Sequence, residues 1–358
     1  MNRSLAPVVS RRASRGEGLS AGPPRGLNRA GRGPIRVLLC CNPAYCQHLA
    51  VTLVSMLENN PANDFDIHLV LSARSVAQEA RLWWSLGACR NFTLAVHDFA
   101  VPDRAEFFVD NHVTVDTYLR IFAADVLPER IDRILYLDCD LVVLGDLRDL
   151  WSTDIGGHAL AAVPEPYGAG GRDFLGIPPG RPYVNAGVML LDLDRWREER
   201  LSEKLVQFIE RHGNRLWYWD QDAINAVLHS DILPLDYRWN VQAQMFKLDA
   251  RKYPEVAGAI RQACRRPAII HYSTAEKPWR FRAIVKHKLP YFHYIAQTAW
   301  RGTRPEGLRW YHLPELYMDH TLARLGVDYT LIVRVLRRVR RAVQDGITRV
   351  RHWRQASG

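Results

Sequence analysis

The sequence predicts an α/β fold, in which helices cover both faces of a central sheet. Two observations support this prediction. From residue 35 onward, short apolar runs typical of buried strands alternate with longer segments of helical character. The chain has 358 residues, of which 47% are hydrophobic, so it is long enough to build a large packed core.

The first half of the chain contains three strands separated by helical segments. A short turn at residues 42–45 leads from the first strand into the first helix, which ends at the Asn-Asn-Pro sequence of residues 59–61. Pro128 lies just beyond the end of the third helix. We expect strands over residues 35–41, 66–71 and 92–97, and helices over residues 47–58, 75–86 and 115–127.

The second half continues this pattern around a loop rich in glycine and proline. This loop, residues 168–180, has the composition of a mobile lid over a binding site. We expect strands over residues 158–163, 184–193 and 269–272, and helices over residues 194–211 and 220–228.

The chain is organised around residues 131–151. An apolar run typical of a buried strand ends in Asp138 and Asp140, and we expect both side chains on the same face, because alternate residues of a strand share a face. Two like charges so close together are costly in an apolar place unless something positive neutralises them. A divalent cation bound by carboxylate oxygens would do so. The alternative is a pair of solvated acids at a strand end.

The net charge of +10 comes from the two ends of the chain. Residues 1–34 carry +6 and residues 330–358 carry +7, which leaves −3 for the rest. The first segment has few large apolar groups and is expected to be disordered. We expect the second to form an amphipathic, Arg-rich helix that binds an anionic membrane surface, with a solvated helix face as the alternative. Nucleic-acid binding would rest on these basic ends alone, and we do not expect it.

The cysteines, the N-terminus and the lack of a long apolar run predict where in the cell the protein is found. The six cysteines include no repeated C-x-x-C pair, which predicts reduced thiols in a cytoplasmic protein. The basic N-terminus lacks the apolar segment of a secretory signal, and no apolar run reaches the ~18 residues of a membrane span. We therefore expect a cytoplasmic protein that is bound peripherally at the inner face of the membrane.

Four separate stretches are more specific together than any one of them. They are Tyr136–Asp140, Asn185–Val188, Asp220–Asp222, and His271 with Lys277–Trp279. In this order they resemble glycosyltransferase family 8, the retaining enzymes that include bacterial lipopolysaccharide galactosyl- and glucosyltransferases and glycogenin. The resemblance covers roughly residues 35–280, and its most specific motif is H-x5-K-P-W.

The resemblance implies the GT-A fold, a Rossmann-like α/β fold with a mixed, mainly parallel sheet and flanking helices. It implies transfer of galactose or glucose from a UDP-sugar to a glycan or lipid-linked acceptor of the cell envelope, with Mn²⁺ or Mg²⁺ as cofactor. Asp138, Asp140 and His271 would bind the metal, and Lys277 would meet the diphosphate. The residue chemistry agrees, because a diphosphate leaving group needs positive charge and this ligand set suits a divalent ion.

The same resemblance implies roles around the donor sugar. Gln221 would face the cationic sugar centre through its carbonyl oxygen, in a mechanism of same-face attack. Asp220 could instead act as a nucleophile, and the sequence leaves both mechanisms open. The other donor-binding positions implied are Asn42, Tyr45, Arg120, Glu165, Asn185 and Ala186.

Three positions depart from the family pattern. Asn42 stands where an acid near the base is usual, Glu165 where a shorter Asp is common, and Thr274 where Gly is common. The departures at Asn42 and Thr274 keep open a non-catalytic sugar-nucleotide-binding protein, and the longer Glu165 could shift sugar specificity. A D-x-D sequence after an apolar strand also marks haloacid-dehalogenase-like phosphohydrolases, which is a second alternative.

These observations divide the chain into four expected parts. They are a disordered basic segment (1–34), a GT-A catalytic domain (35–280), a C-terminal extension (281–328) and the amphipathic helix (329–358).

Overall fold

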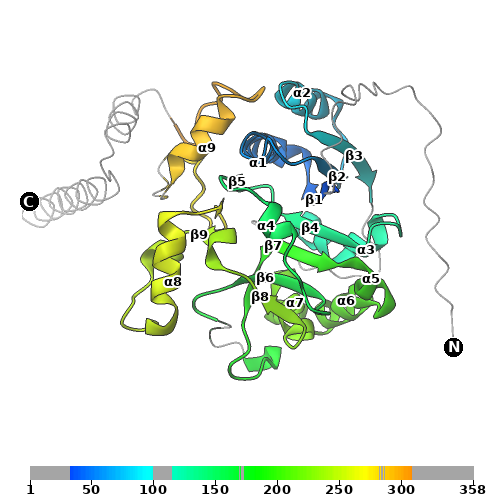
Figure 1. Cartoon of the computed structure of the whole chain (residues 1–358), viewed down its shortest axis with the longest axis vertical. Helices are drawn as coiled ribbons and strands as arrows, with labels where there is room; N and C mark the ends of the chain where they lie inside the picture. The colour runs from blue at the N-terminus through cyan, green and yellow to red at the C-terminus, as the bar shows by residue number, and fades with distance from the viewer. Residues whose placement is uncertain are drawn as a thin grey trace, which may run out of the picture. The chain divides into compact units, whose positions relative to one another are not determined.

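The structure is a computed structural model that describes residues 33–99, 115–168, 173–281 and 287–308, together with residues 170, 283 and 285. In this part of the chain, a seven-stranded sheet in the order β3-β2-β1-β4-β7-β6-β8 carries the fold (Figure 1). Its strands are β1 (Ile35–Cys41), β2 (Phe65–Leu71), β3 (Phe92–Asp98), β4 (Arg133–Leu137), β6 (Leu160–Pro164), β7 (Val184–Asp192) and β8 (Ile232–Pro234).

Helices pack against both faces of this sheet. Side chains of β1 alternate between two hydrophobic cores: Val37 and Leu39 belong to the core that includes α1 and α2, whereas Leu38 belongs to the core that includes α5, α6 and α7. Burial on both faces explains why the strand reads as a continuous apolar run. The helices are α1 (Cys46–Glu58), α2 (Val76–Leu86), α3 (Ala123–Val126), α4 (Arg148–Trp151), α5 (Leu193–Glu198), α6 (Leu201–His212), α7 (Trp219–Leu228), α8 (Pro254–Arg265) and α9 (Lys288–Ile295).

Strand directions confirm the predicted α/β class with a mixed, mainly parallel sheet. The strands β3, β2, β1 and β4 run parallel, and β6 runs parallel to β8. The strand β7 runs antiparallel to both of its neighbours, β4 and β6. Its register pairs Leu137 with Val188, so the Asn-Ala-Gly sequence at the start of β7 lies beside the carboxyl end of β4. This is the edge where α/β proteins bind ligands.

A second, three-stranded sheet in the order β5-β10-β9 brings distant residues to the same place. It consists of β5 (Leu141–Val143), β9 (Val241–Gln242) and β10 (Ile269–His271). The register pairs His271 with Leu141 on one side and with Gln242 on the other. Because Leu141 directly follows Asp140, the small sheet carries His271 to the two acids.

The structure places the two acids differently from the strand expected. Asp138 and Asp140 lie in the turn between β4 and β5, where the chain leaves the large sheet after Leu137 and enters the small one at Leu141. The interior of a strand covered on both faces would bury two like charges without room for their partners. The turn leaves Asp138 and Asp140 half-buried and open to groups from other elements.

Two predicted helices also differ. The helix expected over residues 115–127 consists of a 3-10 helix, Val115–Phe122, followed by the short α3. The helix expected over residues 194–211 is divided into α5 and α6 at Arg200, whose backbone is left-handed with a φ of 53°. An arginine carries no sequence signal for that conformation, which favours glycine and asparagine.

Several expectations fall on residues outside the described ones. The basic segment 1–34, apart from its last two residues, and the helix expected over residues 329–358 are among them, as are three positions of the loop 168–180. Among the described residues, no helix is long and apolar enough to cross a membrane.

Candidate active site

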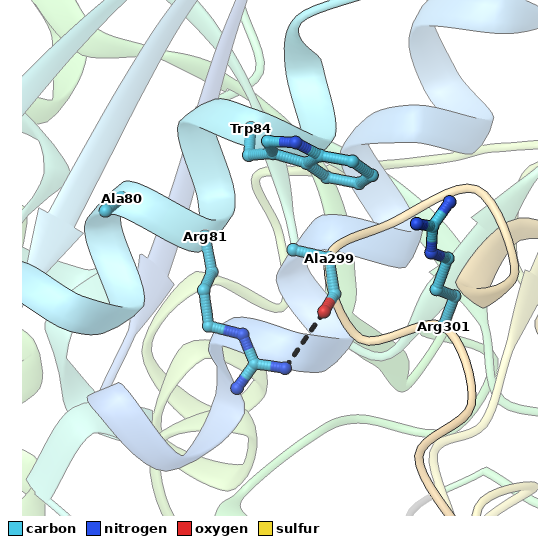
Figure 2. A pocket seen from close by; sticks show the side chains of 5 residues that line it. All are labelled: Ala80, Arg81, Trp84, Ala299 and Arg301. Atoms are coloured by element: carbon cyan, nitrogen blue, oxygen red, sulfur yellow. Dashed lines mark hydrogen bonds between the residues drawn. The ribbon is translucent and has the colours of Figure 1, made fainter.

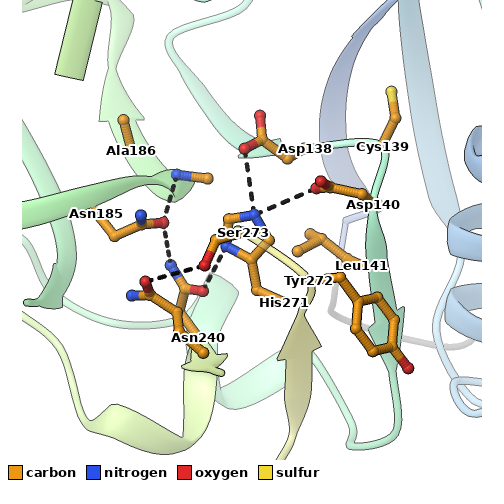
Figure 3. A network of polar contacts seen from close by, with 12 residues as sticks. Asp138, Cys139, Asp140, Leu141, Asn185, Ala186, Asn240, His271, Tyr272 and Ser273 are labelled. Carbon is orange, nitrogen blue, oxygen red and sulfur yellow. Dashed lines mark hydrogen bonds and ion pairs between the residues drawn. The ribbon is translucent and has the colours of Figure 1, made fainter. Parts of the chain in front are cut away.

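The three predicted metal ligands lie together at the junction of the two sheets. The Nε2 atom of His271 lies 3.2 Å from Oδ1 of Asp140 and 3.5 Å from Oδ2 of Asp138, as Figure 3 shows. One ligand atom from each of the three residues falls within 4.8 Å of the others. Residues separated by more than 130 positions in the sequence therefore present two carboxylates and an imidazole to one point.

A hydrogen bond from the far side fixes the imidazole. Nδ1 of His271 lies 2.9 Å from Oδ1 of Asn240, and the Asn240 amide nitrogen donates to Oδ1 of Asn185 at 2.8 Å. Since Asn240 presents its oxygen to the ring, the Nδ1–H group of His271 donates to it, and Nε2 is the ring nitrogen that faces the acids. Such an orienting partner is usual behind metal-binding histidines. Asn240 is fully buried and is a site residue that the sequence reading missed.

In each acid, one carboxylate oxygen contacts neighbouring side chains and the other faces His271. Oδ1 of Asp138 accepts from the Tyr136 hydroxyl at 2.7 Å and pairs with Arg120 at 3.1 Å. Oδ2 of Asp140 pairs with the Lys277 ammonium at 2.6 Å. The remaining oxygen of each acid faces His271. Although burial favours the neutral form, Lys277 and His271 together hold the pKa of Asp140 well below its usual range.

This donor set fits a divalent cation. Two carboxylates and an imidazole are ligands that Mn²⁺ accepts, and Mg²⁺ accepts the carboxylates. The backbone of β7 passes so close to His271 and Asp138 that only a glycine fits there. A Cβ added to Gly187 would lie 2.3 Å from Cε1 of His271 and 2.7 Å from Oδ2 of Asp138. The glycine of the Asn-Ala-Gly sequence is therefore required by the close approach of β7 to the ligands.

Removing the Asn240 amide should weaken metal binding without unfolding the site. We expect Asn240→Ala to lower Mn²⁺ affinity by about 10–100-fold, the usual effect of losing a partner behind a metal-binding histidine. Asn240→Asp retains an acceptor for Nδ1–H and should lose less. Calorimetric Mn²⁺ titration checks this, with Asn214→Ala, at an exposed asparagine, as control. Equal affinities of Asn240→Ala and the unmodified protein would contradict the role given to Asn240.

A second group of hydrogen bonds surrounds Asn185 and Gln221. The amide nitrogen of Asn185 donates to Oε1 of Glu165 and to Oε1 of Gln221, both at 3.0 Å. Oε1 of Gln221 also accepts from the backbone N–H of Ala186 at 3.1 Å. The structure thus brings four predicted donor-sugar residues into one network, which Asn240 connects to His271.

The amide nitrogen of Gln221 is held by Tyr183, which is held in turn by Asp222, the third residue of the Asp-Gln-Asp sequence. The Gln221 amide nitrogen donates to the Tyr183 hydroxyl at 3.2 Å, and Tyr183 donates to Oδ1 of Asp222 at 2.5 Å. Oδ2 of Asp222 accepts from the backbone N–H groups of Trp217 and Tyr218. Asp222 therefore secures the turn that begins α7 and, through Tyr183, the orientation of Gln221.

Asp220 lies behind the site rather than on its surface. Its side chain is 2% exposed, and its Oδ2 lies 2.8 Å from Nε of Arg120, which also pairs with Asp138. Burial, opposed in part by Arg120, raises the pKa of Asp220 from 3.8 to about 7. The Arg120 guanidinium thus joins two of the predicted site carboxylates.

This pKa predicts a stability that falls as pH rises. Between about pH 4 and pH 7 the folded protein keeps a proton on Asp220 that the unfolded chain has lost, so the free energy of unfolding should decrease by up to about 1.4 kcal/mol per pH unit. Asp220→Asn should remove this contribution. Urea unfolding in EDTA at several pH values measures this contribution to the free energy of unfolding. The control is Asp194→Asn, because the Asp194 side chain is 60% exposed. An identical pH slope in Asp220→Asn would contradict the assignment.

A pocket of about 180 Å³ opens beside the acids. The Asn42 side chain accepts from the backbone N–H of Tyr45 at 3.1 Å, which fixes the turn after β1 at the pocket. Tyr45 packs edge-on against Trp279, and Trp279 is buried and stacked on His48 at 3.5 Å. The Trp of the K-P-W sequence is therefore a core residue. The pocket is lined by Asn42, Tyr45, Thr117, Arg120, Asp138 and Asp140, among others.

Comparison with known proteins assigns the family. The family described as "Glycosyl transferase family 8" matches residues 36–283. The chain belongs to glycosyltransferase family 8. This membership confirms the resemblance in the sequence and disfavours the phosphohydrolase alternative.

Relatives of known name agree with the family 8 assignment. General stress protein A of Bacillus subtilis (strain 168) is 30% identical over 276 residues, which span 74% of this chain and 94% of that protein. A lipopolysaccharide 1,2-glucosyltransferase of Escherichia coli (strain K12) is 31% identical over 193 residues, 52% of this chain and 56% of that enzyme.

A solved structure confirms the GT-A fold. The galactosyltransferase LgtC, in complex with donor and acceptor sugar analogs, superposes with a TM-score of 0.67 at 23% identity, and the match covers 76% of this chain and 98% of LgtC. The family 8 chain therefore has the GT-A fold, with Asp138 directly after the carboxyl end of β4.

Proposed function

We propose that the protein is a metal-dependent retaining transferase that moves a hexose, galactose or glucose, from a UDP-sugar to a glycan or lipid-linked acceptor of the cell envelope. The observation that carries the proposal is the convergence of Asp138, Asp140 and His271 within 4.8 Å, beside a pocket that Asp138 and Asp140 also line. The family's named glucosyl- and galactosyltransferases support the choice of hexose.

The charged residues suit the leaving diphosphate. A divalent ion held by Asp138, Asp140 and His271 would supply positive charge to the diphosphate oxygens as the glycosidic bond breaks. We assign Lys277 and Arg120 to the same task from the protein side. Lys277 pairs with Asp140 at 2.6 Å, so its ammonium already lies at the edge of the site that the diphosphate would occupy. Asn42 and Tyr45 also line the pocket, and we place the nucleoside base beside them.

The amide network suits the sugar. We place the hexose against Glu165, Asn185, Ala186 and Gln221, whose orientations are set by their mutual hydrogen bonds. Gln221 is neutral and rigidly held, so it can stabilise a cationic sugar centre without forming a bond to it. Asp220 is 1% exposed, and we propose that it positions Arg120 rather than attacking the sugar. This choice favours same-face attack over double displacement.

The Arg-rich segment provides the proposed location. We propose that residues 329–358 bind the anionic inner face of a membrane and bring the cytoplasmic domain to a lipid-linked acceptor. Deleting residues 330–358 should release the protein from anionic vesicles and leave donor hydrolysis unchanged. Tight vesicle binding by the shortened chain would end this part of the proposal.

A screen of nucleotide sugars tests the function. We expect a UDP-hexose to raise the melting temperature of the full chain only when Mn²⁺ or Mg²⁺ is present, because a ligand stabilises the folded state by RT ln(1 + [L]/Kd). Slow hydrolysis of the same UDP-hexose should accompany it. Binding of the donor without hydrolysis or transfer would favour the non-catalytic alternative, and a response to GDP-sugars alone would contradict the assignment of the donor.

A further inference from the structure

The helix α2 exposes an apolar face that the catalytic site does not use. Eight positions between residues 76 and 88 are exposed, and Arg81 is the only charged residue among them. Trp83 is 46% exposed and Trp84 is 56% exposed, far more than the packing of an indole usually leaves. The exposed positions are Val76, Ala77, Ala80, Arg81, Trp83, Trp84, Gly87 and Ala88.

A hollow of about 480 Å³ lies between this face and the loop after α9. Figure 2 shows Trp84 on one side of it and Arg301 on the other. The Arg301 guanidinium lies 5.4 Å from the centre of a Trp84 ring, and the Arg81 guanidinium donates to the carbonyl of Ala299. The hollow therefore combines an exposed indole with a cation at its rim.

We propose that this face of α2, with Arg301, is a docking surface for an anionic lipid bilayer. Tryptophan is favoured at the boundary between head groups and acyl chains, because its apolar body and its N–H group prefer different sides of that boundary. Arginine beside it attracts lipid phosphates. The one acid of α2, Glu79, pairs with Arg74 at 2.5 Å, so the face presents little negative charge to repel them.

The positive charge of the chain that follows this surface in the sequence agrees with an anionic membrane as its partner. The described residues end at Leu308, seven residues after Arg301, and residues 330–358 of the continuing chain carry a net charge of +7. The surface thus adds a contact from the folded domain to the membrane association proposed above. A second copy of the chain fits less well, because one face of a helix about 16 Å long offers less than the roughly 800 Å² per partner of a stable interface.

Vesicle binding of the full chain tests the surface. We expect Trp83→Ala/Trp84→Ala to weaken binding to vesicles of phosphatidylglycerol and phosphatidylcholine by about tenfold or more. Trp217→Ala, which removes a tryptophan that is 61% exposed at the start of α7, should change binding less than about twofold. Arg301→Glu should weaken binding to these vesicles and leave the weak binding to pure phosphatidylcholine unchanged.

A second measurement detects the indoles directly. Brominated lipids should quench part of the tryptophan fluorescence of the bound protein, and Trp83→Phe/Trp84→Phe should lose that part. Unchanged affinity of the alanine variant together with unchanged quenching in the phenylalanine variant would overturn the proposal. So would a dimer of the unmodified chain that the alanine variant abolishes, because a second copy would then occupy the face. Donor hydrolysis, measured without vesicles, tests the proposed function separately and should be the same in the Trp83, Trp84 and Arg301 variants as in the unmodified protein.

Discussion

Asp140→Asn should abolish metal-dependent hydrolysis of the UDP-sugar donor while the protein stays folded. The substitution keeps the shape of the side chain but removes the charge that faces both Lys277 and His271. A carboxylate that helps to hold the ion is expected to contribute several kcal/mol to charge stabilisation, so we expect a loss of at least about 1,000-fold in the rate. Initial rates at saturating Mn²⁺ measure the effect.

Asp149 supplies the matched control for this variant. It lies nine residues further along the chain, is exposed on α4, and Asp149→Asn makes the same change of charge. Its rate should equal that of the unmodified protein. If Asp140→Asn retained more than about a tenth of the activity, the carboxylate would have no essential role and the metal assignment would be wrong.

Gly187→Ala should disrupt the metal site, although Gly187 has no side chain that could bind the ion. An added Cβ would overlap Cε1 of His271 at 2.3 Å and Oδ2 of Asp138 at 2.7 Å, so both ligands must move. Displacement by about 1 Å is enough to disrupt a site whose geometry must hold within about 0.5 Å. We expect Mn²⁺ affinity to fall by at least about 100-fold. This is more than the fall expected when a residue that only orients a ligand, such as Asn240, is removed. Calorimetric titration of Mn²⁺ measures it.

Gly258→Ala tests whether this effect comes from the site. A Cβ on Gly258, inside α8, would meet nothing within 4 Å. Alanine is the better helix former, so this variant should be as stable as the unmodified protein or up to about 1 kcal/mol more stable, with unchanged Mn²⁺ affinity. Equal Mn²⁺ affinities in the two alanine variants would show that β7 does not constrain the ligands.

Local sequence patterns predict the elements of this site better than the contacts between them. The apolar run of residues 35–41 matches β1 residue for residue, because a run this short that is followed directly by a turn favours a buried strand over a helix. A cation site at Asp138 and Asp140 was likewise expected from residue type and spacing, whereas His271 was implied as a ligand only by the resemblance to the family. By contrast, the antiparallel direction of β7 depends on how the chain crosses the sheet, which no local pattern encodes.

Residues that act through another residue were the ones the sequence did not identify. Asn240 follows a tryptophan and precedes the two-residue strand β9, so its amide resembles an ordinary turn residue until the register of β9 and β10 places it behind His271. Lys277 was expected at the diphosphate from the resemblance alone, and its ion pair with Asp140 at 2.6 Å was not foreseen. Lys277 and Arg120 thus place positive charge beside the two acids, which the local pattern around Asp138 and Asp140 does not predict.

Direct titration of Mn²⁺ into the full chain in the presence of UDP tests the central claim, that two acids and a distant imidazole hold one ion beside the donor pocket. The account predicts one bound Mn²⁺ per chain, with binding at least about 100-fold weaker in His271→Ala and unchanged in His158→Ala, a half-buried histidine of the loop before β6. Binding of equal affinity in His271→Ala and the unmodified protein, or no binding in either, would contradict it.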